Sequence, residues 1–594
     1  MSGTPDKRSF DVDLAALLRV FGGHLYSTPD VFVRELIQNG LDAIAVRRHI
    51  EGRGDFAIEV VGDPERGVVT FRDDGIGLDE HDLVRHLSRV GASTKRDTAA
   101  PGLIGQFGIG LLSGFLVADR LVVDTRKAGG APLRWSAEVD GKYTVEPSDR
   151  TAIGSTVTVH LRPEMASYGD PEILAELLGR YVAYVDTPIR LRGGEDGEAI
   201  IINRAPLWAA GTDDERLAAI RERFGEEALA CRALVLAEGG ARGLLWLRRA
   251  ATGFSSPRCA LTSRGVLVTP SDPDLLPRWA RFVGGTFDGP GLTPTASRES
   301  FVKDHAWRAL AQRLRAEVIA WLVEVAGERS AMMAELFAHH HVSLMAACLD
   351  DRSLLEAFAG RLPFETNAGV LTLEEIAASA PIVRYSRSSR DFGRLAPTAS
   401  ARGELLINAS HVHEVDLLGA WAALEPGRAV ESVTIESLAD LAEGAPEHEL
   451  RFARLLAASD HLLAGYDVVT RLRRFLPPEA PVLLLADPDQ LRERARVLEA
   501  GGSPLQQALV RGLGITRARV MMPLLLNADN PLIAALPELV PPAIGARVVR
   551  MLYLQAASLA RRVPSIHESR RLGEDLLALL RELQGSTRVQ GDLN

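Results

Sequence analysis

The chain has 594 residues, of which 46% are hydrophobic and 25% are charged, a composition typical of a globular protein with several cores rather than of a disordered or fibrous one. Its formal net charge of −10 argues against a protein whose main task is to coat nucleic acid, since that task needs an excess of Lys and Arg. The three cysteines are far apart and form no C-x-x-C pair, which indicates neither a disulfide framework nor a zinc cage and fits a reducing compartment best.

The first predicted element is a helix that contains the segment RELIQNGLDAI. Thr28 is a suitable N-cap residue, and Pro29 fits the first helical position because its missing N–H is not needed there. Glu35, Asn39 and Asp42 stand at i, i+4 and i+7 and therefore share one face. This helix is expected to turn three polar side chains in one direction.

Strands are expected next, because residues 56–62 and 68–74 are rich in Val and Phe and are joined by a turn-like segment. Residues 119–125 and 154–161 are two further candidates. Together with the helix they predict an α+β layer domain over the first 190 or so residues, followed by a short polar linker at 192–198.

Strands and helices alternate again from residue 200 to about 440, including a long helix at 305–326. Helices dominate beyond that point. The last one carries an apolar stripe at helical spacing, formed by Leu572, Leu576, Leu579, Leu580 and Leu583. The stripe must be buried either within its own domain or on a second copy of the chain, and we favour the second copy.

Two glycine-rich stretches carry the chemistry. The strand VVTFRDDGIGLDE ends in an acidic pair followed by Gly75 and Gly77, which allow a tight turn and a close approach of a ligand to the backbone. Alone, this pattern is more often an ordinary turn. The stretch GLIGQFGIGLLSGFLVADR (102–120) exposes successive N–H groups at the start of a helical segment, where phosphate is favoured. The chain has no G-x-x-x-x-G-K-[ST], so a Walker-type P-loop is excluded.

The order of these motifs, E-x-x-x-N-x-x-D, then D-x-G-x-G, then G-x-x-G-x-G, resembles the GHKL group of gyrase, heat-shock protein 90, histidine kinase and MutL ATPases. The segments LYSTPDVFVRELIQNGLDAI, FRDDGIGL, GASTK and LIGQFGIGLLSGFLVADR are most similar to the N-terminal domain of the heat-shock protein 90 chaperones. NRAPLW and RFVGGTFDGPGLTPTASRESF resemble the middle domain of that family, and LLLNADNPLIAAL its C-terminal domain.

The resemblance implies an α+β multidomain fold. Its parts are an N-terminal GHKL (Bergerat) α/β sandwich ATPase domain at 1–195, an α/β middle domain with a catalytic Arg loop at 200–440, and a mainly helical C-terminal dimerisation domain at 445–594.

Roles carried over by motif make Glu35 the general base that orients the attacking water, and Arg298 of the SRE loop the cation that neutralises the γ-phosphate of ATP. Asn39 would hold Mg²⁺, and Asp73 would accept a hydrogen bond from the adenine amino group. The remaining expected nucleotide-binding residues are Asp42, Gly77, Lys95, Gly105, Gln106, Phe107, Gly108, Ile109, Gly110 and Ser155. An isolated Glu on a helix, Asp in a turn or Arg in a loop would more simply be solvated.

Three positions depart from the family pattern. His86 stands where the family usually has an Asn that contacts the ribose, and Leu111 replaces the usual aromatic residue. Val302 occupies a position where a Gln often assists the arginine. These departures bear on the affinity for the nucleotide and on the rate of hydrolysis that the resemblance implies.

The function that the resemblance implies is an ATP-dependent, Mg²⁺-requiring chaperone, a homodimeric clamp joined through its C-terminal helices that acts on client proteins. We expect a cytoplasmic protein without nucleic-acid or membrane partners, since no window approaches a membrane span. The C-terminus VQGDLN lacks the acidic pentapeptide that docks tetratricopeptide co-chaperones. One alternative is a nucleotide-binding scaffold or switch with little hydrolysis. The other is a MutL-type ATPase, which the acidic charge disfavours.

Overall fold

The computed structural model describes residues 28–52, 54–87, 110–182, 184–209, 211–236, 240–250, 258–295, 297–327, 331–434, 443–444, 448–484, 522–559 and 565–591. The chain divides into two compact units, Met1–Trp321 and Leu322–Asn594, each of which is described by itself. Among the helices in these ranges, none combines the length and apolar composition that a bilayer crossing requires.

An eight-stranded sheet in the order β5-β4-β3-β6-β2-β1-β7-β8 organises the first part of unit 1. Only β1 and β7 pair in parallel; the other neighbours are antiparallel. The strands are β1 (Ile58–Asp63), β2 (Val68–Asp73), β3 (Ala118–Arg126), β4 (Leu133–Glu138), β5 (Tyr143–Pro147), β6 (Gly154–Leu161), β7 (Ile189–Gly193) and β8 (Ile200–Ile201).

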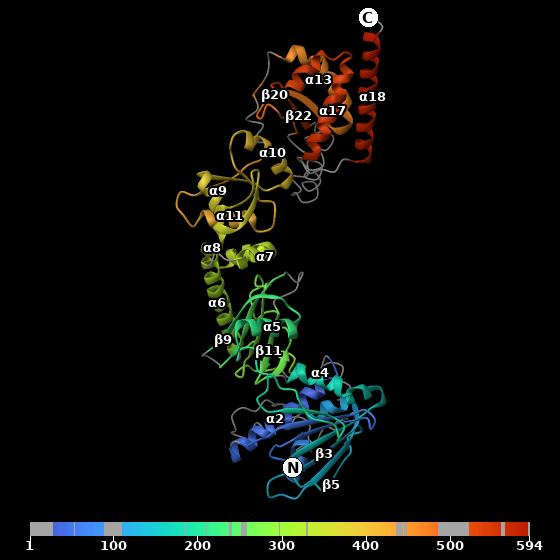
Figure 1. Cartoon of the computed structure of the whole chain (residues 1–594), viewed down its shortest axis with the longest axis vertical. Coiled ribbons are helices and arrows are strands. Elements are labelled where there is room, and N and C mark those ends of the chain that lie inside the picture. Colours follow the sequence, from blue (N-terminus) through green and yellow to red (C-terminus); the bar gives the residue numbers. More distant parts are fainter. Residues whose placement is uncertain are drawn as a thin grey trace, which may run out of the picture. The chain divides into compact units, whose positions relative to one another are not determined.

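Helices α2 (Val31–Glu51) and α4 (Pro171–Tyr181) lie on the same side of this sheet (Figure 1). The core between the two layers includes Phe32 of α2, whose ring meets Phe71 of β2 edge-on at 6.2 Å. Burial of such large apolar groups stabilises the domain and holds α2 against the sheet. The opposite face of α2 is therefore left to carry its polar residues.

The helix start differs from the sequence prediction. Helix α2 begins at Val31, and the hydroxyl of Thr28 donates to the carboxylate of Asp30 instead of capping the helix. Asp30 also accepts from the hydroxyl of Tyr181 in α4 at 3.2 Å. A contact with α4 therefore holds the residue before the helix. Local capping preferences alone do not predict such a contact.

A second sheet follows in unit 1, in the order β12-β11-β13-β10-β9. Its strands are β9 (Ala228–Val235), β10 (Arg242–Arg248), β11 (Arg258–Ser263), β12 (Val266–Thr269) and β13 (Val283–Asp288). Helix α5 (Asp213–Phe224) precedes these strands in the chain, and helix α6 (His305–Gly327) follows them. The SRE loop lies between β13 and α6. The long helix predicted at 305–326 is present as α6.

Unit 2 contains a sheet in the order β15-β14-β17-β16-β18 and a smaller one in the order β19-β20-β22-β21. Its strands are β14 (Pro363–Thr366), β15 (Gly369–Thr372), β16 (Ile382–Ser386), β17 (Leu406–Asn408), β18 (Ala429–Ser432), β19 (Glu443–Gly444), β20 (Val468–Arg474), β21 (Val482–Leu484) and β22 (Met522–Asn527). Its helices include α7 (Ala331–Asp350), α8 (Arg352–Phe358), α9 (Leu373–Ser379), α10 (Ser389–Ala401), α11 (Glu414–Ala422), α13 (Glu449–Leu463), α16 (Pro531–Ala535), α17 (Pro542–Leu559) and α18 (Ile566–Gly591). The predicted α+β multidomain class is confirmed, and the C-terminal part adds a four-stranded sheet to the expected helices.

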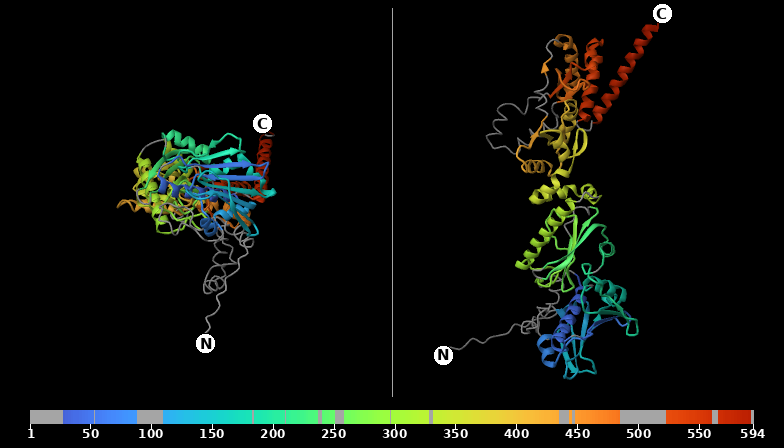
Figure 2. Two further views of the ribbon diagram at one scale, coloured as in Figure 1. Left: turned by 90° about the horizontal axis from the view of Figure 1, so that it is seen from below. Right: turned by 60° about the vertical axis from the view of Figure 1, so that its left-hand side comes forward.

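The C-terminal helix α18 stands at the edge of unit 2, and its far end extends away from the body of that unit (Figure 2). It is held to α17 by Asp575, whose carboxylate accepts from Arg550 at 2.6 and 2.8 Å and from Arg547 at 2.9 Å. Of the predicted apolar stripe, Leu576 is 45% and Leu580 is 55% exposed. The helix is thus anchored on one side and leaves leucines uncovered on another.

Candidate functional site

The polar face of α2 is largely withdrawn from solvent. Glu35 is 1% exposed, Gln38 is 1% and Asp42 is 4% exposed, while Asn39 is half-buried. Burial of a carboxylate is costly unless opposite charges and hydrogen-bond donors surround it. The structure therefore contradicts the interpretation of Glu35 as a solvated helix residue.

Two arginines surround the Glu35 carboxylate. Nη1 of Arg298 donates to Oε2 at 2.7 Å, and Nη2 of Arg34 donates to Oε1 at 3.2 Å. Arg298 is itself 5% exposed and adopts φ 54°, a left-handed conformation that is uncommon outside glycine and is found at functional sites. The loop after β13 thus places its guanidinium against the helix that carries the candidate base.

Arg34 also fixes the loop from which Arg298 projects. Its Nη1 donates to the backbone carbonyl of Arg298 at 2.9 Å, and its Nη2 donates to that of Ser297 at 3.0 Å. One buried guanidinium therefore contacts both the Glu35 carboxylate and the backbone of the loop. The cluster of Arg34, Glu35 and Arg298 carries one excess positive charge, an electrostatic environment that favours an anionic ligand.

Asp73 lies at the end of β2, opposite Ser155 of β6 in the antiparallel register. The N–H of Gly75 donates to its carboxylate at 2.8 Å, and the hydroxyls of Ser155 and Thr125 lie 3.0 Å apart. Burial raises the pKa of Asp73 to about 7, an effect that the Gly75 hydrogen bond only partly offsets. A carboxyl group poised near neutrality beside a glycine turn is typical of a binding site.

Two glycines keep the backbone close to these groups. Gly77 has φ 71°, and a Cβ there would lie 2.0 Å from the carbonyl oxygen of Arg126, so no larger residue fits. A Cβ on Gly110 would lie 3.2 Å from Oε2 of Glu35 and 3.3 Å from the amide atoms of Asn39. The second glycine-rich stretch therefore passes, at Gly110, directly over the polar face of α2.

The structure brings together seven of the predicted site residues: Glu35, Asn39 and Gly110 around Arg298, and Asp73 with Ser155 and Gly77 at the strand ends. Asp42 is on the same helix face, one turn further from Glu35. Six others lie outside the described residues, namely Lys95, Gly105, Gln106, Phe107, Gly108 and Ile109.

Comparison with known proteins bears on the same part of the chain. A family model described as "Histidine kinase-, DNA gyrase B-, and HSP90-like ATPase" matches residues 26–153. The "Chaperone protein HtpG" of Rhodospirillum rubrum is 29% identical over 399 residues, 61% of this chain and 63% of that protein. The protein of the same name from Rhodococcus jostii is 30% identical over 386 residues, 55% of this chain and 59% of its own length.

Residues 26–153 thus match an ATPase family model, and about 60% of the chain is similar to HtpG chaperones. The HtpG chaperone of Polaromonas sp. is a third relative, 27% identical over 406 residues, which are 60% of this chain and 65% of that protein. The chain thus spans less than two thirds of the length of each of these curated relatives.

Two residues that contact Arg298 were not predicted from the sequence. They are Arg34 and Gln38, which stand at i and i+4 on α2. A signal was present, because a charged and an amide side chain interrupt the apolar run of a helix that packs on a sheet.

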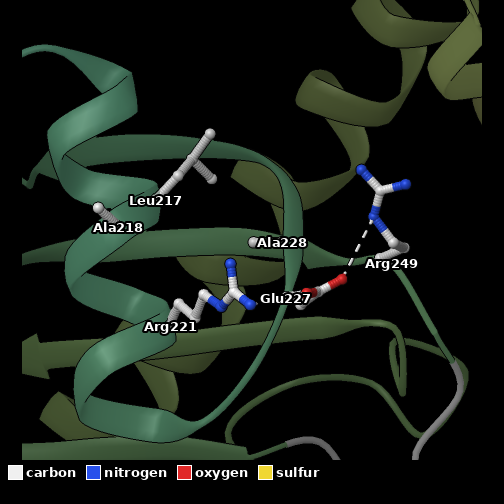
Figure 3. A pocket seen from close by; sticks show the side chains of 6 residues that line it. All are labelled: Leu217, Ala218, Arg221, Glu227, Ala228 and Arg249. Atoms are coloured by element: carbon white, nitrogen blue, oxygen red, sulfur yellow. Dashed lines mark ion pairs between the residues drawn. The ribbon is translucent and has the colours of Figure 1, made fainter.

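A pocket of about 270 Å³ lies elsewhere in unit 1, between α5 and the sheet, and is lined by Leu217, Ala218, Arg221, Glu227, Ala228 and Arg249. Figure 3 shows the Glu227 carboxylate between the two guanidinium groups, to which it is paired at 3.7 and 3.8 Å. None of the predicted site residues lines this pocket. Because it holds none of those residues, we assign it no role in the proposed chemistry.

Proposed function

We propose that the chain is an ATP-dependent molecular chaperone that binds and hydrolyses ATP and uses the reaction to drive a dimeric clamp cycle on client proteins. The observation that carries the proposal is the contact of Arg298 with Glu35, which joins the loop after β13 to the helix of the GHKL domain. The match to the ATPase family model and the names of the relatives support the proposal.

In the proposed mechanism Glu35 is the base that orients a water molecule toward the terminal phosphate. Phosphoryl transfer needs positioning and charge neutralisation more than covalent catalysis. The excess positive charge of the arginine cluster supplies the neutralisation. When the terminal phosphate binds, Arg298 exchanges part of its contact with Glu35 for the phosphate, which frees the carboxylate for water.

We infer that Asp73 selects adenine, because its carboxylate accepts from the exocyclic amino group and would face a lone pair of the guanine oxygen. The carboxamide of Asn39 fits a magnesium ion, because a neutral oxygen donor lies beside Gly110, where the absence of a Cβ leaves space for bound phosphates. Asn39 would hold such an ion, which would supply charge neutralisation for bound phosphates.

The three predicted domains, 1–195, 200–440 and 445–594, are part of the proposal, as is a homodimer formed through the C-terminal helices. The uncovered leucines of α18, Leu576 and Leu580, support an interface with a second copy.

The alternative of a nucleotide-binding switch with little turnover has one observation in its favour. Both oxygens of Glu35 are already engaged by arginines, so the base is occupied before any nucleotide arrives. Steady-state hydrolysis that depends on Arg298 would distinguish the chaperone ATPase from the switch.

Replacing the base gives the direct test. We expect Glu35→Ala to reduce ATP hydrolysis by about 10²-fold or more, because a positioned general base contributes on this order. Titration calorimetry with Mg·ATP should give a dissociation constant close to that of the wild type. Glu65→Gln, an exposed change in the β1–β2 turn, is the matched control. Equal loss of binding and hydrolysis in Glu35→Ala would contradict the assigned role.

The chaperone activity needs its own measurement. We expect the wild-type protein to suppress the aggregation of a thermally unfolded test protein in light scattering, with a different efficiency in ATP than in ADP. Identical curves in both nucleotides would contradict a chaperone cycle driven by ATP.

A further inference from the structure

Gln38 is the third residue of α2 that contacts the Arg298 loop, one helical turn beyond Glu35 and Arg34. Gln38 is 1% exposed, and its Oε1 accepts a hydrogen bond from Nη1 of Arg298. Within the described ranges, Nε2 of the same carboxamide has no hydrogen-bond partner. Buried amide donors are normally satisfied, so this one needs an explanation.

The chemistry of the pair fixes the orientation of the amide. A guanidinium has only donors, so the atom that faces Arg298 must be the carboxamide oxygen, and the nitrogen must be the atom left over. Rotating the amide would place two donors against each other. The unsatisfied N–H groups of Gln38 therefore follow from the contact with Arg298.

The same nitrogen of Arg298 is shared by two acceptors on α2. Nη1 donates to Glu35 Oε2 at 2.7 Å and to Gln38 Oε1, which uses both of its N–H groups. The loop itself presents the apolar side chain of Val302 four residues further on, 44% exposed. The Val302 side chain offers no acceptor to the guanidinium, and both acceptors of Nη1 belong to α2. Helix α2 therefore sets the direction of the guanidinium.

We propose that Gln38 is a positioning residue for ATP hydrolysis, in which Oε1 aims the Arg298 guanidinium and Nε2 donates to an oxygen of the terminal phosphate. The inference rests on the proposed ATPase function. It explains why an amide is buried here: one carboxamide offers an acceptor to the arginine and a donor to the anion that the arginine neutralises. A purely structural Gln would satisfy both ends within the protein.

Two substitutions separate the two ends of the carboxamide. Gln38→Leu removes both, and Gln38→Glu keeps an acceptor for Arg298 but replaces the donor by a second oxygen. We expect Gln38→Leu to lower kcat by about 10- to 100-fold, the range that small misplacements of catalytic groups produce. The dissociation constant for ADP should change less than about threefold, because ADP lacks the phosphate in question.

Gln38→Glu should lower the affinity for ATP by about tenfold or more relative to that for ADP, because two negative charges then face each other. Gln312→Leu, the same change at an exposed position of α6, is the matched control and should leave kcat and both affinities unchanged. Thermal unfolding of each variant checks that it folds. If Gln38→Leu does not fold, the ATP-to-ADP affinity ratio of Gln38→Glu decides the question.

A double-mutant cycle gives the readout that a structural role would not produce. In an Arg298→Lys background, whose ammonium cannot reproduce the planar contact with Glu35 and Gln38, the effect of Gln38→Leu on kcat should be smaller than in the wild type, because the part that acts through the guanidinium is already lost. Wild-type kcat in Gln38→Leu, or equal losses of ADP binding and ATP turnover, would overturn the inference while leaving the ATPase proposal intact. A wild-type protein that binds ATP but does not hydrolyse it would overturn both.

Discussion

Nη1 of Arg298 lies 2.7 Å from Oε2 of Glu35, so a guanidinium and a carboxylate that are 263 positions apart in the chain form one buried ion pair. The pair joins the candidate base to the candidate phosphate-neutralising cation. Under the proposed function, we expect a nucleotide phosphate to compete with Glu35 for the arginine, which would couple the binding of ATP to the release of the Glu35 carboxylate.

Removing the cation tests this coupling. We expect Arg298→Ala to reduce ATP turnover by about 10³-fold, the magnitude associated with arginine fingers, in a steady-state phosphate-release assay. Arg298→Lys should recover only part of the rate, because an ammonium lacks the planar fork of donors. Arg221→Ala, at a largely exposed arginine, is the control. Full activity in Arg298→Ala would exclude this role.

Arg34 should matter for stability as well as for turnover. Arg34→Ala leaves the Glu35 carboxylate and the carbonyls of Ser297 and Arg298 without their buried donor. We expect a loss of about 3–5 kcal/mol in the free energy of unfolding, measured by urea denaturation, since each buried acceptor left without a donor costs about 1–3 kcal/mol. Arg66→Ala, at an exposed surface pair, should change it by less than about 1 kcal/mol. Equal effects of the two changes would refute the prediction.

Gly110→Ala should weaken the binding of Mg·ATP. The added Cβ lies 3.2 Å from the Glu35 carboxylate and 3.3 Å from the Asn39 amide, where the nucleotide phosphates are proposed to bind. We expect a loss of affinity of about tenfold or more in calorimetry, about 1.4 kcal/mol. Gly179→Ala in α4 meets nothing within 4 Å and should keep the affinity while raising helix stability slightly. Unchanged affinity in Gly110→Ala would place the phosphates elsewhere.

The raised pKa of Asp73 predicts a pH-dependent effect on stability. The folded protein holds this proton up to about pH 7, whereas the unfolded chain releases it near the ordinary carboxyl pKa of 3.8. Protonation therefore favours folding at low pH, and this contribution is lost as the pH rises to 7 and above. Asp73→Asn removes the titrating group. The free energy of unfolding of the wild type should therefore fall relative to that of Asp73→Asn between pH 4 and pH 8, by about 4 kcal/mol at most.

Urea denaturation at several pH values measures this difference, with Glu65→Gln as an exposed control that should show no such trend. A wild-type curve that stays parallel to that of Asp73→Asn would refute the raised pKa.

The anchor of α18 can be tested separately. Asp575 is fully buried and accepts from Arg550 and Arg547, and the pKa of Arg550 is raised mainly by its hydrogen bond to this carboxylate. Asp575→Asn should lower the free energy of unfolding by about 3–5 kcal/mol, because two guanidinium groups lose their counter-charge. Glu574→Gln, next to it but half-exposed, should cost less than about 1 kcal/mol. Urea denaturation measures both losses. Equal losses in Asp575→Asn and Glu574→Gln would argue against the anchor.

The amino-acid sequence by itself predicted the helix and four strands that carry the candidate site, and the resemblance to an ATPase domain that the family model also finds. Helical periodicity put Glu35 and Asn39 on one face, and β-branched runs bounded by turn residues predicted β1, β2, β3 and β6. Strand β5 was not predicted because it lies at the edge of the sheet and is largely exposed, and β4, between β5 and β3, buries only two of its six residues.

The tertiary structure alone decided which side chains meet. Nothing in the local pattern places Gln38 or Arg34 against a loop more than 260 positions away, and neither the burial of Glu35 nor the raised pKa of Asp73 can be obtained from neighbours along the chain. Periodicity fixes the direction of a side chain relative to its own helix. Partners and dielectric surroundings depend on how separate elements pack, and that packing is set by contacts between residues distant in sequence.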